Sequence, residues 1–116
     1  MSVRLEISEY ADADLTGIED YIKFHLSAPK AASKASALIL DAMHTLSDFP
    51  ESGTAVMSPD GYRTPYRVLI CEKHYAISYA FDRNTQKVWV YRVFHTTQDW
   101  LALLLGRGSG VQKEQD

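Results

Sequence analysis

The chain has 116 residues, of which 46% are hydrophobic, 23% charged and 11% aromatic. These proportions are typical of one soluble globular domain and exclude an intrinsically disordered chain. A single cysteine, Cys71, excludes an internal disulfide framework and a cysteine-based zinc site. No apolar run approaches the ~18 residues that span a bilayer, and Glu6 interrupts the apolar run that a signal peptide would need. We therefore expect a cytoplasmic protein that does not enter a membrane.

The net charge of −3 is unevenly distributed along the chain. Residues 1–61 contain four Lys or Arg against ten Asp or Glu, a balance of −6, whereas residues 62–116 contain eight against five, a balance of +3. The overall acidity, with a pI near 5.7, argues against binding nucleic acid through bulk charge. The second half can still present a local basic face.

Hydrophobic periodicity predicts one strand and two helices in the first half. Residues 3–8 alternate apolar and polar side chains, as a half-buried strand does. Spacings of three and four then predict a helix over residues 9–26, with Ser8 as its N-cap. Pro29 suits the first turn of a second helix, over residues 29–47. The first apolar stripe comprises Ala11, Leu15, Ile18, Ile22 and Leu26. The second comprises Ala31, Ala35, Leu38, Ala42, Leu46 and Phe49, widened by Ile39 and Met43.

Period-two patterns predict three strands in the second half, over residues 66–71, 75–81 and 87–95. Residues 51–54 are expected to form a turn and residues 55–62 to be irregular. Strand 75–81 alternates large and small residues, so its aromatic side chains should share one face and leave the other shallow. A short helix over residues 97–105, capped by Thr96 or Thr97, is possible, and residues 106–116 are expected to be a flexible tail.

The resulting order, β-α-α-β-β-β with a possible final helix, predicts an α+β fold. A helical hairpin should pack on one face of a small, mainly antiparallel sheet, because both apolar stripes need a surface to cover. We expect a single domain over residues 1–105, with the opposite face of the sheet open to solvent.

Few residues have the spacing of a chemical site. The four histidines lack metal-ligand spacing, and no glycine-rich phosphate loop, nucleophile elbow or Cys/His pair is present, so no metal or cofactor is expected. Cys71 lies in the most apolar strand and is expected to be a buried, inert thiol. His95, at a strand end, suits either a general acid or base or a side chain that fixes the corner, and the pattern favours the corner.

Three arginines, Arg63, Arg67 and Arg92, form the second candidate group. Within strands, a guanidinium needs solvent or a carboxylate. They can form a face that receives phosphate or a partner's carboxylates, or structural ion pairs with Glu72, Asp82 or Asp99, and both interpretations stay open. The many aromatic residues favour a core or groove over base stacking. The residues alone indicate a small interaction module with a partly basic sheet face.

Several motifs in this order, between residue 3 and about residue 103, resemble the RelE/ParE superfamily of bacterial type II toxin–antitoxin toxins, some of which are labelled plasmid stabilisation proteins. The motifs are Ala11-x-x-x-Leu15-x-x-Ile18-x-x-Tyr21-Ile22, Leu46-x-x-Phe49-Pro50-x-x-Gly53, Tyr66-Arg67-Val68-Leu69 and Tyr91-Arg92-Val93-Phe94-His95-x-x-x-Asp99-Trp100.

The resemblance implies one of two activities. RelE-like members cleave mRNA in the ribosomal A site with cations on the sheet; that alternative would place catalysis on Arg67, Arg92 and His95. ParE-like members inhibit DNA gyrase and are not nucleases. Here Ala76 follows Tyr75 where RelE types usually carry an arginine, and the segment after residue 95 is not basic. His95-x-x-x-Asp99-Trp100 matches ParE-like sequences, so we expect a gyrase inhibitor without catalytic residues.

The resemblance also implies a cognate antitoxin as partner and no sequence-specific DNA binding by the toxin alone. An extended antitoxin segment would fold into a groove on the small-residue face of the sheet. A non-toxic antitoxin-binding module is a further alternative. The residues expected to bind antitoxin or target are Arg63, Arg67, Ala76, Ser78, Ala80, Arg92, His95, Asp99 and Trp100.

Overall fold

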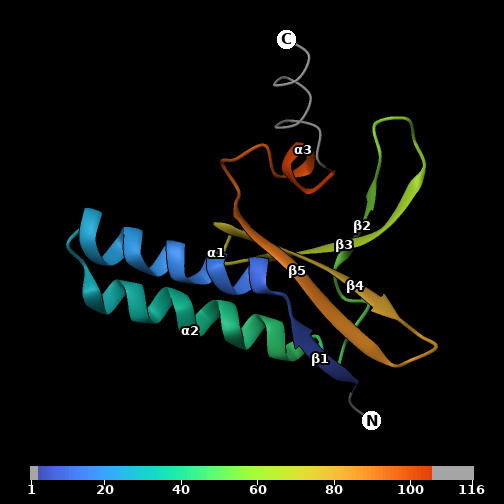
Figure 1. The fold of residues 1–116 in the computed structure, drawn as a ribbon, viewed down its shortest axis with the longest axis horizontal. Coiled ribbons are helices and arrows are strands. Elements are labelled where there is room, and N and C mark those ends of the chain that lie inside the picture. The colour runs from blue at the N-terminus through green and yellow to red at the C-terminus, as the bar shows by residue number, and fades with distance from the viewer. Residues whose placement is uncertain (1–2, 106–116) are drawn as a thin grey trace.

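The computed structural model describes residues 3–105, and the expected tail, residues 106–116, lies outside the described residues. The elements are β1 (Arg4–Ile7), α1 (Glu9–Asp20), α2 (Pro29–Thr45), β2 (Thr54–Met57), β3 (Arg63–Cys71), β4 (Tyr75–Asp82), β5 (Lys87–His95) and α3 (Trp100–Leu105). Figure 1 shows α1 and α2 as an antiparallel hairpin beside the sheet, with α3 lying apart from them. Within the described part of the chain, no helix combines the length and apolar character needed to cross a membrane.

The five strands form one sheet in the order β1-β5-β4-β3-β2. β1 is parallel to β5, and the other neighbours are antiparallel. The expected α+β architecture is therefore confirmed. β2 is a correction, because residues 55–62 were expected to be irregular. This strand has only four residues and its register with β3 shifts between Ala55 and Met57, so it is too short and uneven for a period-two signal.

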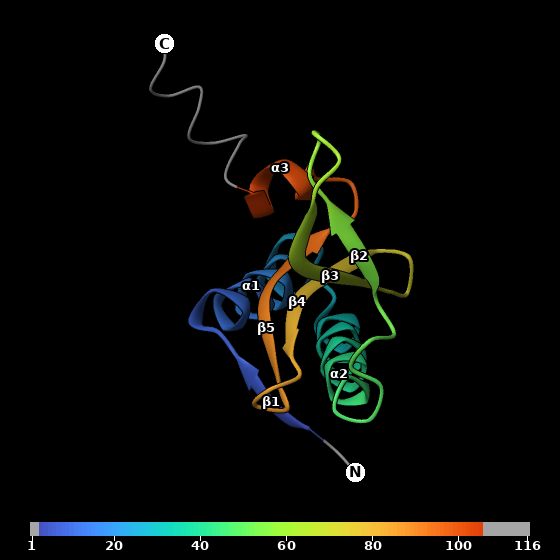
Figure 2. The same ribbon diagram turned by 90° about the vertical axis from the view of Figure 1, so that its right-hand side faces the viewer.

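The helical hairpin covers one face of the sheet, as Figure 2 shows from the side. Ser8 accepts a hydrogen bond from the Ala11 N–H, which confirms it as the N-cap of α1. The second stripe is confirmed at Leu46, Ile39 and Met43, which are fully buried, and is wrong at its two ends, since Ala31 is exposed and Phe49 is 66% exposed. Within α2 the buried side chains are Ala32, Ile39 and Met43, so Ala32 takes the buried place that was expected for Ala31. Ile39, Met43 and Leu46 form one buried cluster with Ile77, Tyr79, Val88, Val90 and Val93 of the sheet.

α1 does not continue to residue 26 as an α-helix. Tyr21–His25 form one π-helical turn, in which the Leu26 N–H donates to the Tyr21 carbonyl. Ser27 then adopts a φ of 52° and the chain reverses into α2. Such a wider turn rotates the following side chains away from the α-helical stripe. Leu26, the last residue of the predicted stripe, is exposed, as are Tyr21 and Phe24 near the hairpin tip.

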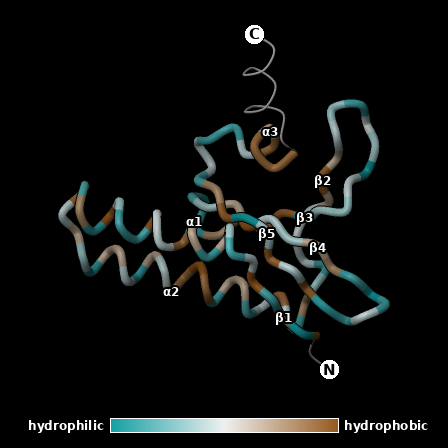
Figure 3. The backbone as a smooth tube through the Cα atoms, viewed as in Figure 1, coloured by the Kyte–Doolittle hydropathy of each residue, from teal (hydrophilic) through white to brown (hydrophobic). Residues whose placement is uncertain are grey.

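The opposite face of the sheet is partly covered, which corrects the expectation of an open face. α3 packs there, and Leu104 joins a second buried cluster with Val56, Val68, Ala76 and Phe94. Figure 3 shows how apolar this short helix is. Its first turn is capped by Asp99, which accepts from the Ala102 N–H at 3.4 Å, rather than by Thr96 or Thr97.

A register shift in β5 sets which side chains face the helices. Ser78 pairs with Arg92 and Tyr79 pairs with Val90, so Tyr91 is an extra residue on β5. As a result, Val90 and Val93 both belong to the helix-facing core although they are three residues apart. The Ser78 hydroxyl lies at the shift, 3.2 Å from both the backbone N–H and the carbonyl oxygen of Arg92.

Candidate functional site

The three residues of the ribonuclease alternative do not converge. Arg67 pairs with Tyr79 of β4, whereas His95 pairs with Tyr75, four residues along the same strand. At ~3.3 Å per residue this offset is roughly 13 Å along the strand direction. Acid–base catalysis requires groups within hydrogen-bond reach of the same reacting atoms, so this arrangement brings together no catalytic set from Arg67, Arg92 and His95.

The Arg92 guanidinium is held by Asp14 of α1. Arg92 Nε and Nη2 donate to the two carboxylate oxygens at 2.8 and 3.0 Å. The same carboxylate accepts from the Val93 N–H at 2.8 Å. The hydrogen bonds that Arg92 donates to Asp14 raise the pKa of Arg92 further above its ordinary value, against the effect of burial. The partners proposed from sequence, Glu72, Asp82 and Asp99, are therefore wrong for Arg92.

Arg67 binds backbone carbonyls rather than a carboxylate. Its Nη1 donates to the Gly53 carbonyl at 2.7 Å and to the Glu51 carbonyl at 3.2 Å. The Gly53 N–H in turn donates to the buried Tyr79 hydroxyl at 2.9 Å. Arg67 thus fastens the segment between α2 and β2 onto the sheet, and the expected ion-pair partners Glu72, Asp82 and Asp99 are wrong here too.

His95 fixes the corner between β5 and α3. Its Nδ1 lies 3.2 Å from the Thr97 backbone N and 2.8 Å from the Thr97 hydroxyl. A backbone N–H can only donate, so Nδ1 accepts and the neutral ring carries its proton on Nε2. The ring packs edge-on against Tyr75 and lies 6.2 Å from the His74 ring. The corner interpretation is therefore the one that the contacts support.

The other predicted binding residues are divided between core and surface. Ala76 and Ser78 are fully buried, so they line no open groove, which corrects their assignment to an exposed face. Trp100 packs against the cluster under α3, beside the capping Asp99. The small-residue face stays accessible around Ala80, beyond the end of α3.

A basic groove opens where β3 separates from β4. The pairing of these strands begins at Arg67 and Tyr79. Arg63, at the start of β3, pairs with Met57 of β2, and Ala80–Asp82 of β4 have no β3 partner. The groove has a volume of about 600 Å³. We define this basic groove by the residues Arg63, Thr64, Tyr66, Arg67, Ala80, Arg83, Lys87 and Trp89, with Glu51 and Asp82 at its rim.

Lys87, Trp89 and Arg83 belong to this groove but not to the binding residues predicted from the sequence. Trp89 pairs with Ala80 across the ladder and is 39% exposed, and the Lys87 ammonium lies 5.1 Å from the centre of its ring. Arg83 binds the Glu51 side chain. The period-two pattern, which places Trp89 opposite a small residue, could have indicated that Trp89 belongs to this surface. The separation of β3 from β4, which exposes Trp89, has no signal in the sequence.

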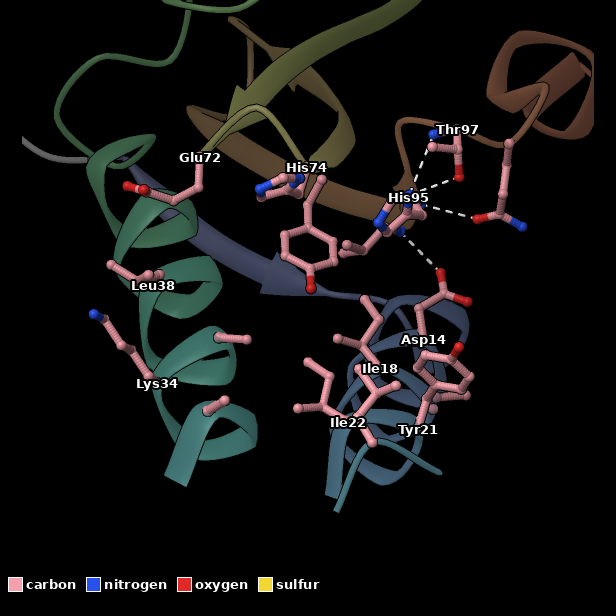
Figure 4. Close-up of a pocket in the computed structure, with 18 residues that line it drawn as sticks. Asp14, Ile18, Tyr21, Ile22, Lys34, Leu38, Glu72, His74, His95 and Thr97 are labelled. Carbon is pink, nitrogen blue, oxygen red and sulfur yellow. Dashed lines mark hydrogen bonds between the residues drawn. The ribbon is translucent and has the colours of Figure 1, made fainter. Parts of the chain in front are cut away.

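A second, larger groove of about 1040 Å³ lies between the two helices at the His95 end of the sheet. Figure 4 shows Leu38 and Lys34 of α2 on one side, and Ile18, Ile22 and Tyr21 on the other, with His74 and His95 at its upper end. We call it the hairpin groove. Its walls are mostly apolar, and Glu72 and Gln98 stand at its rim.

The remaining candidate groups are structural. The Cys71 thiol is buried, which raises its pKa, and nearby Glu72 adds to the effect. Its sulfur lies 3.6 Å from the Leu38 carbonyl oxygen. In residues 3–105, no three His, Cys, Asp or Glu side chains gather in a way that could hold a metal ion.

A helical hairpin on a mainly antiparallel sheet, with two surface grooves, defines a small α+β protein. The family model for the ParE toxin of the type II toxin–antitoxin system parDE matches residues 5–100. The chain belongs to this family and is a type II toxin–antitoxin toxin of the ParE/RelE superfamily.

Two solved structures share the fold. The chromosomal ParDE system from P. aeruginosa matches with a TM-score of 0.66 and 21% identity, over 81% of this chain and 96% of that one. The RelBE2 toxin–antitoxin complex from Mycobacterium tuberculosis matches with a TM-score of 0.57 and 18% identity, over 82% and 99%. No curated protein matches the chain.

Proposed function

We propose that this toxin acts as ParE-like members do, by inhibiting DNA gyrase, and that a cognate antitoxin neutralises it. The observation that carries the proposal is the separation of Arg67, Arg92 and His95. Cleaving a phosphodiester requires donors aimed at the charge that develops on the phosphate. Arg92 instead binds Asp14, Arg67 binds two carbonyls, and His95 holds a corner. This supports a toxin that works by binding rather than by hydrolysis.

We propose the basic groove as the antitoxin site. Arg63, Lys87 and Trp89 surround Ala80, and the edge of β4 from Ala80 to Asp82 lacks a β3 partner. An extended acidic segment can pair with such a free edge and place carboxylates near the cations. Both structural neighbours are toxin–antitoxin systems, which agrees with an antitoxin partner. Of the residues that the sequence analysis expected to bind antitoxin or target, the proposed site includes Arg63, Arg67 and Ala80.

One purified sample tests the activity in two assays. We expect supercoiling by DNA gyrase to be blocked and cleaved DNA to accumulate, while translation of a reporter mRNA in a reconstituted system is unchanged. Codon-biased cuts in the mRNA would overturn the proposal and establish the ribonuclease alternative. Normal supercoiling with intact mRNA, from a sample of native thermal stability, would instead identify a non-toxic binding module. Adding the antitoxin should restore supercoiling.

A further inference from the structure

Phe49 is an exposed aromatic side chain on a fixed turn. It belongs to the motif Leu46-x-x-Phe49-Pro50-x-x-Gly53, yet it is 66% exposed and has no role in the proposed function. The Phe49 carbonyl accepts from the Ser52 N–H at 3.1 Å, and Arg67 binds two carbonyls of the same segment. Because the turn is already held in place, a partner that covers the ring does not have to order this backbone.

A pocket of about 500 Å³ lies beside this ring. We call it the Phe49 pocket, and its walls include Phe49, Pro50, Ser52, Phe81 and the ion pair of Glu51 with Arg83. Glu51, Phe81 and Arg83 also line the basic groove, so the pocket and the groove adjoin each other. Since Glu51 and Arg83 have opposite charges, their shared boundary carries no net charge that would exclude an apolar side chain.

The Phe49 pocket and the basic groove lie on the two sides of β4. Successive side chains of a strand point to opposite faces of its sheet. Ala80 pairs with Trp89 in the basic groove, whereas Phe81 packs against the core under the helices. The edge of β4 from Ala80 to Asp82 has no β3 partner. An extended segment that pairs with this edge would place alternate side chains in the groove and in the pocket.

The two sides of this edge suit different side chains. Arg63 and Lys87 are among the cations of the basic groove, and Arg63 makes no ion pair within residues 3–105, so this side suits carboxylates. Phe49 and Phe81 give the pocket apolar walls, which suit an aliphatic side chain. We infer that the Phe49 pocket binds an apolar side chain of the antitoxin, whose binding segment alternates acidic and apolar residues along β4. This inference rests on the proposed antitoxin site.

Two peptides of identical composition test the inference. The alternating peptide is Asp-Leu-Asp-Leu-Asp-Leu-Asp, and the grouped peptide is Asp-Asp-Leu-Leu-Leu-Asp-Asp. Titration of each into the full-length toxin, followed by amide chemical shifts, measures both the affinity and the place of binding. We expect the alternating peptide to bind at least about fivefold more tightly, because only this order brings carboxylates to the groove and a Leu to the pocket together. Its shift changes should include Phe49 and Phe81.

Two phenylalanine variants form a matched pair, because both side chains are 66% exposed. Phe49→Ala should abolish the preference, so that both peptides bind as the grouped peptide binds the native toxin. Phe24→Ala, at the tip of the helical hairpin and outside the pocket and the basic groove, should keep the preference. Thermal unfolding checks that both variants are folded. Equal binding of the two peptides by the native toxin would overturn the inference.

Arg63→Glu separates the inference from the proposed function. This variant should weaken both peptides at least about fivefold, because it reverses a charge in the basic groove that both peptides need. If it does so while Phe49→Ala leaves the preference unchanged, the antitoxin site stands and the inference about the Phe49 pocket is wrong. If neither peptide binds the native toxin, or if Arg63→Glu changes neither affinity, the proposed antitoxin site fails and the inference fails with it.

Discussion

Asp14 and Arg92 lie 78 residues apart in sequence and form a bidentate pair in which the carboxylate also accepts from the Val93 N–H. The parallel partner β1 reaches only as far as Val90 on β5. Beyond that point the edge of β5 is completed by side chains of α1 and its cap, with Ser8 Oγ donating to the Tyr91 carbonyl at 2.7 Å. Unpaired strand edges otherwise invite pairing with other chains. The pair thus closes an edge as well as joining helix to sheet.

We predict that Asp14→Ala destabilises the protein more than Arg92→Met does. Removing the carboxylate leaves both the guanidinium and the Val93 N–H without an acceptor, whereas Arg92→Met removes one partner of a part-buried pair. A double-mutant cycle by denaturant unfolding should give a coupling of about 1–2 kcal/mol. Arg4→Met, which breaks an exposed pair with Glu6, should cost under about 0.5 kcal/mol. Additive effects of the two substitutions would contradict this interpretation.

Two glycine substitutions should act in opposite directions. A Cβ at Gly53 would stand 2.8 Å from the Val68 carbonyl oxygen and 2.7 Å from the Tyr79 hydroxyl, so Gly53→Ala should cost about 1–3 kcal/mol. Gly17 is in the interior of α1, and no neighbouring atom lies within 4 Å of the position that a Cβ would take there. Gly17→Ala should therefore stabilise the protein by about 0.5–1 kcal/mol. Chemical denaturation measures both. Equal stabilities for the two variants would show that the contact at Gly53 relaxes freely.

Alkaline pH should unfold the protein through one buried and two half-buried tyrosines. Burial raises the pKa of Tyr66, Tyr75 and Tyr79 above the ordinary value of 10.0. The protonated phenol is therefore favoured in the fold, so this stability is fully present below pH 10.0 and is lost as pH rises through the folded pKa values. Tyr79→Phe should make the fall in stability less steep, measured by unfolding at several alkaline pH values. Tyr62→Phe, at a 74% exposed position, should leave the slope unchanged.

The Cys71 thiol should resist alkylation in the native protein. Burial keeps the reagent away, and the raised pKa lowers the thiolate fraction at neutral pH. Labelling followed by mass spectrometry should be slow until denaturant is added. The variant Cys71→Ser/Ile70→Cys, whose thiol lies at a 50% exposed position, should label fast. Equal native labelling rates for the two proteins would mean that this end of β3 opens readily.

Charge reversal in the basic groove should weaken antitoxin binding. Arg63→Glu places a carboxylate where we propose an acidic segment, so the dissociation constant should rise by at least about tenfold. Lys30→Glu reverses a charge in the same way but lies on an exposed part of α2 outside the grooves, and should have little effect. Calorimetric titration measures both. Similar losses for the two variants would indicate long-range attraction instead of contact in the groove.

Four of the five strands, all except β2, and the helical hairpin could be predicted because their signals are local. Ser8 before a helical period, and the large and small alternation over residues 75–81, each need only neighbouring residues. The exposure of Ala31 in place of Ala32 and the π-helical turn at Tyr21–His25 could not, because alanines can satisfy several helical faces and the turn depends on how the chain reverses at Ser27.

The candidate site depended on distant contacts, and there the sequence was less informative. Arg92 was recognised as a cation in need of a partner, but nothing near it in sequence indicates Asp14. The small residues of β4 were recognised as a shallow face, but not that α3 covers Ala76 while Ala80 stays accessible. Both outcomes depend on where separate elements come together, which no local period encodes.

The extra residue at Tyr91 has a practical consequence for protein engineering on β5. Counting alternate positions from Val88 would assign Phe94 to the helical side and Val93 to the other, the inverse of their places in the two buried clusters. A binding motif grafted onto this strand from a protein without the insertion must be offset by one residue after Val90, or its specificity-giving side chains will point into the interior.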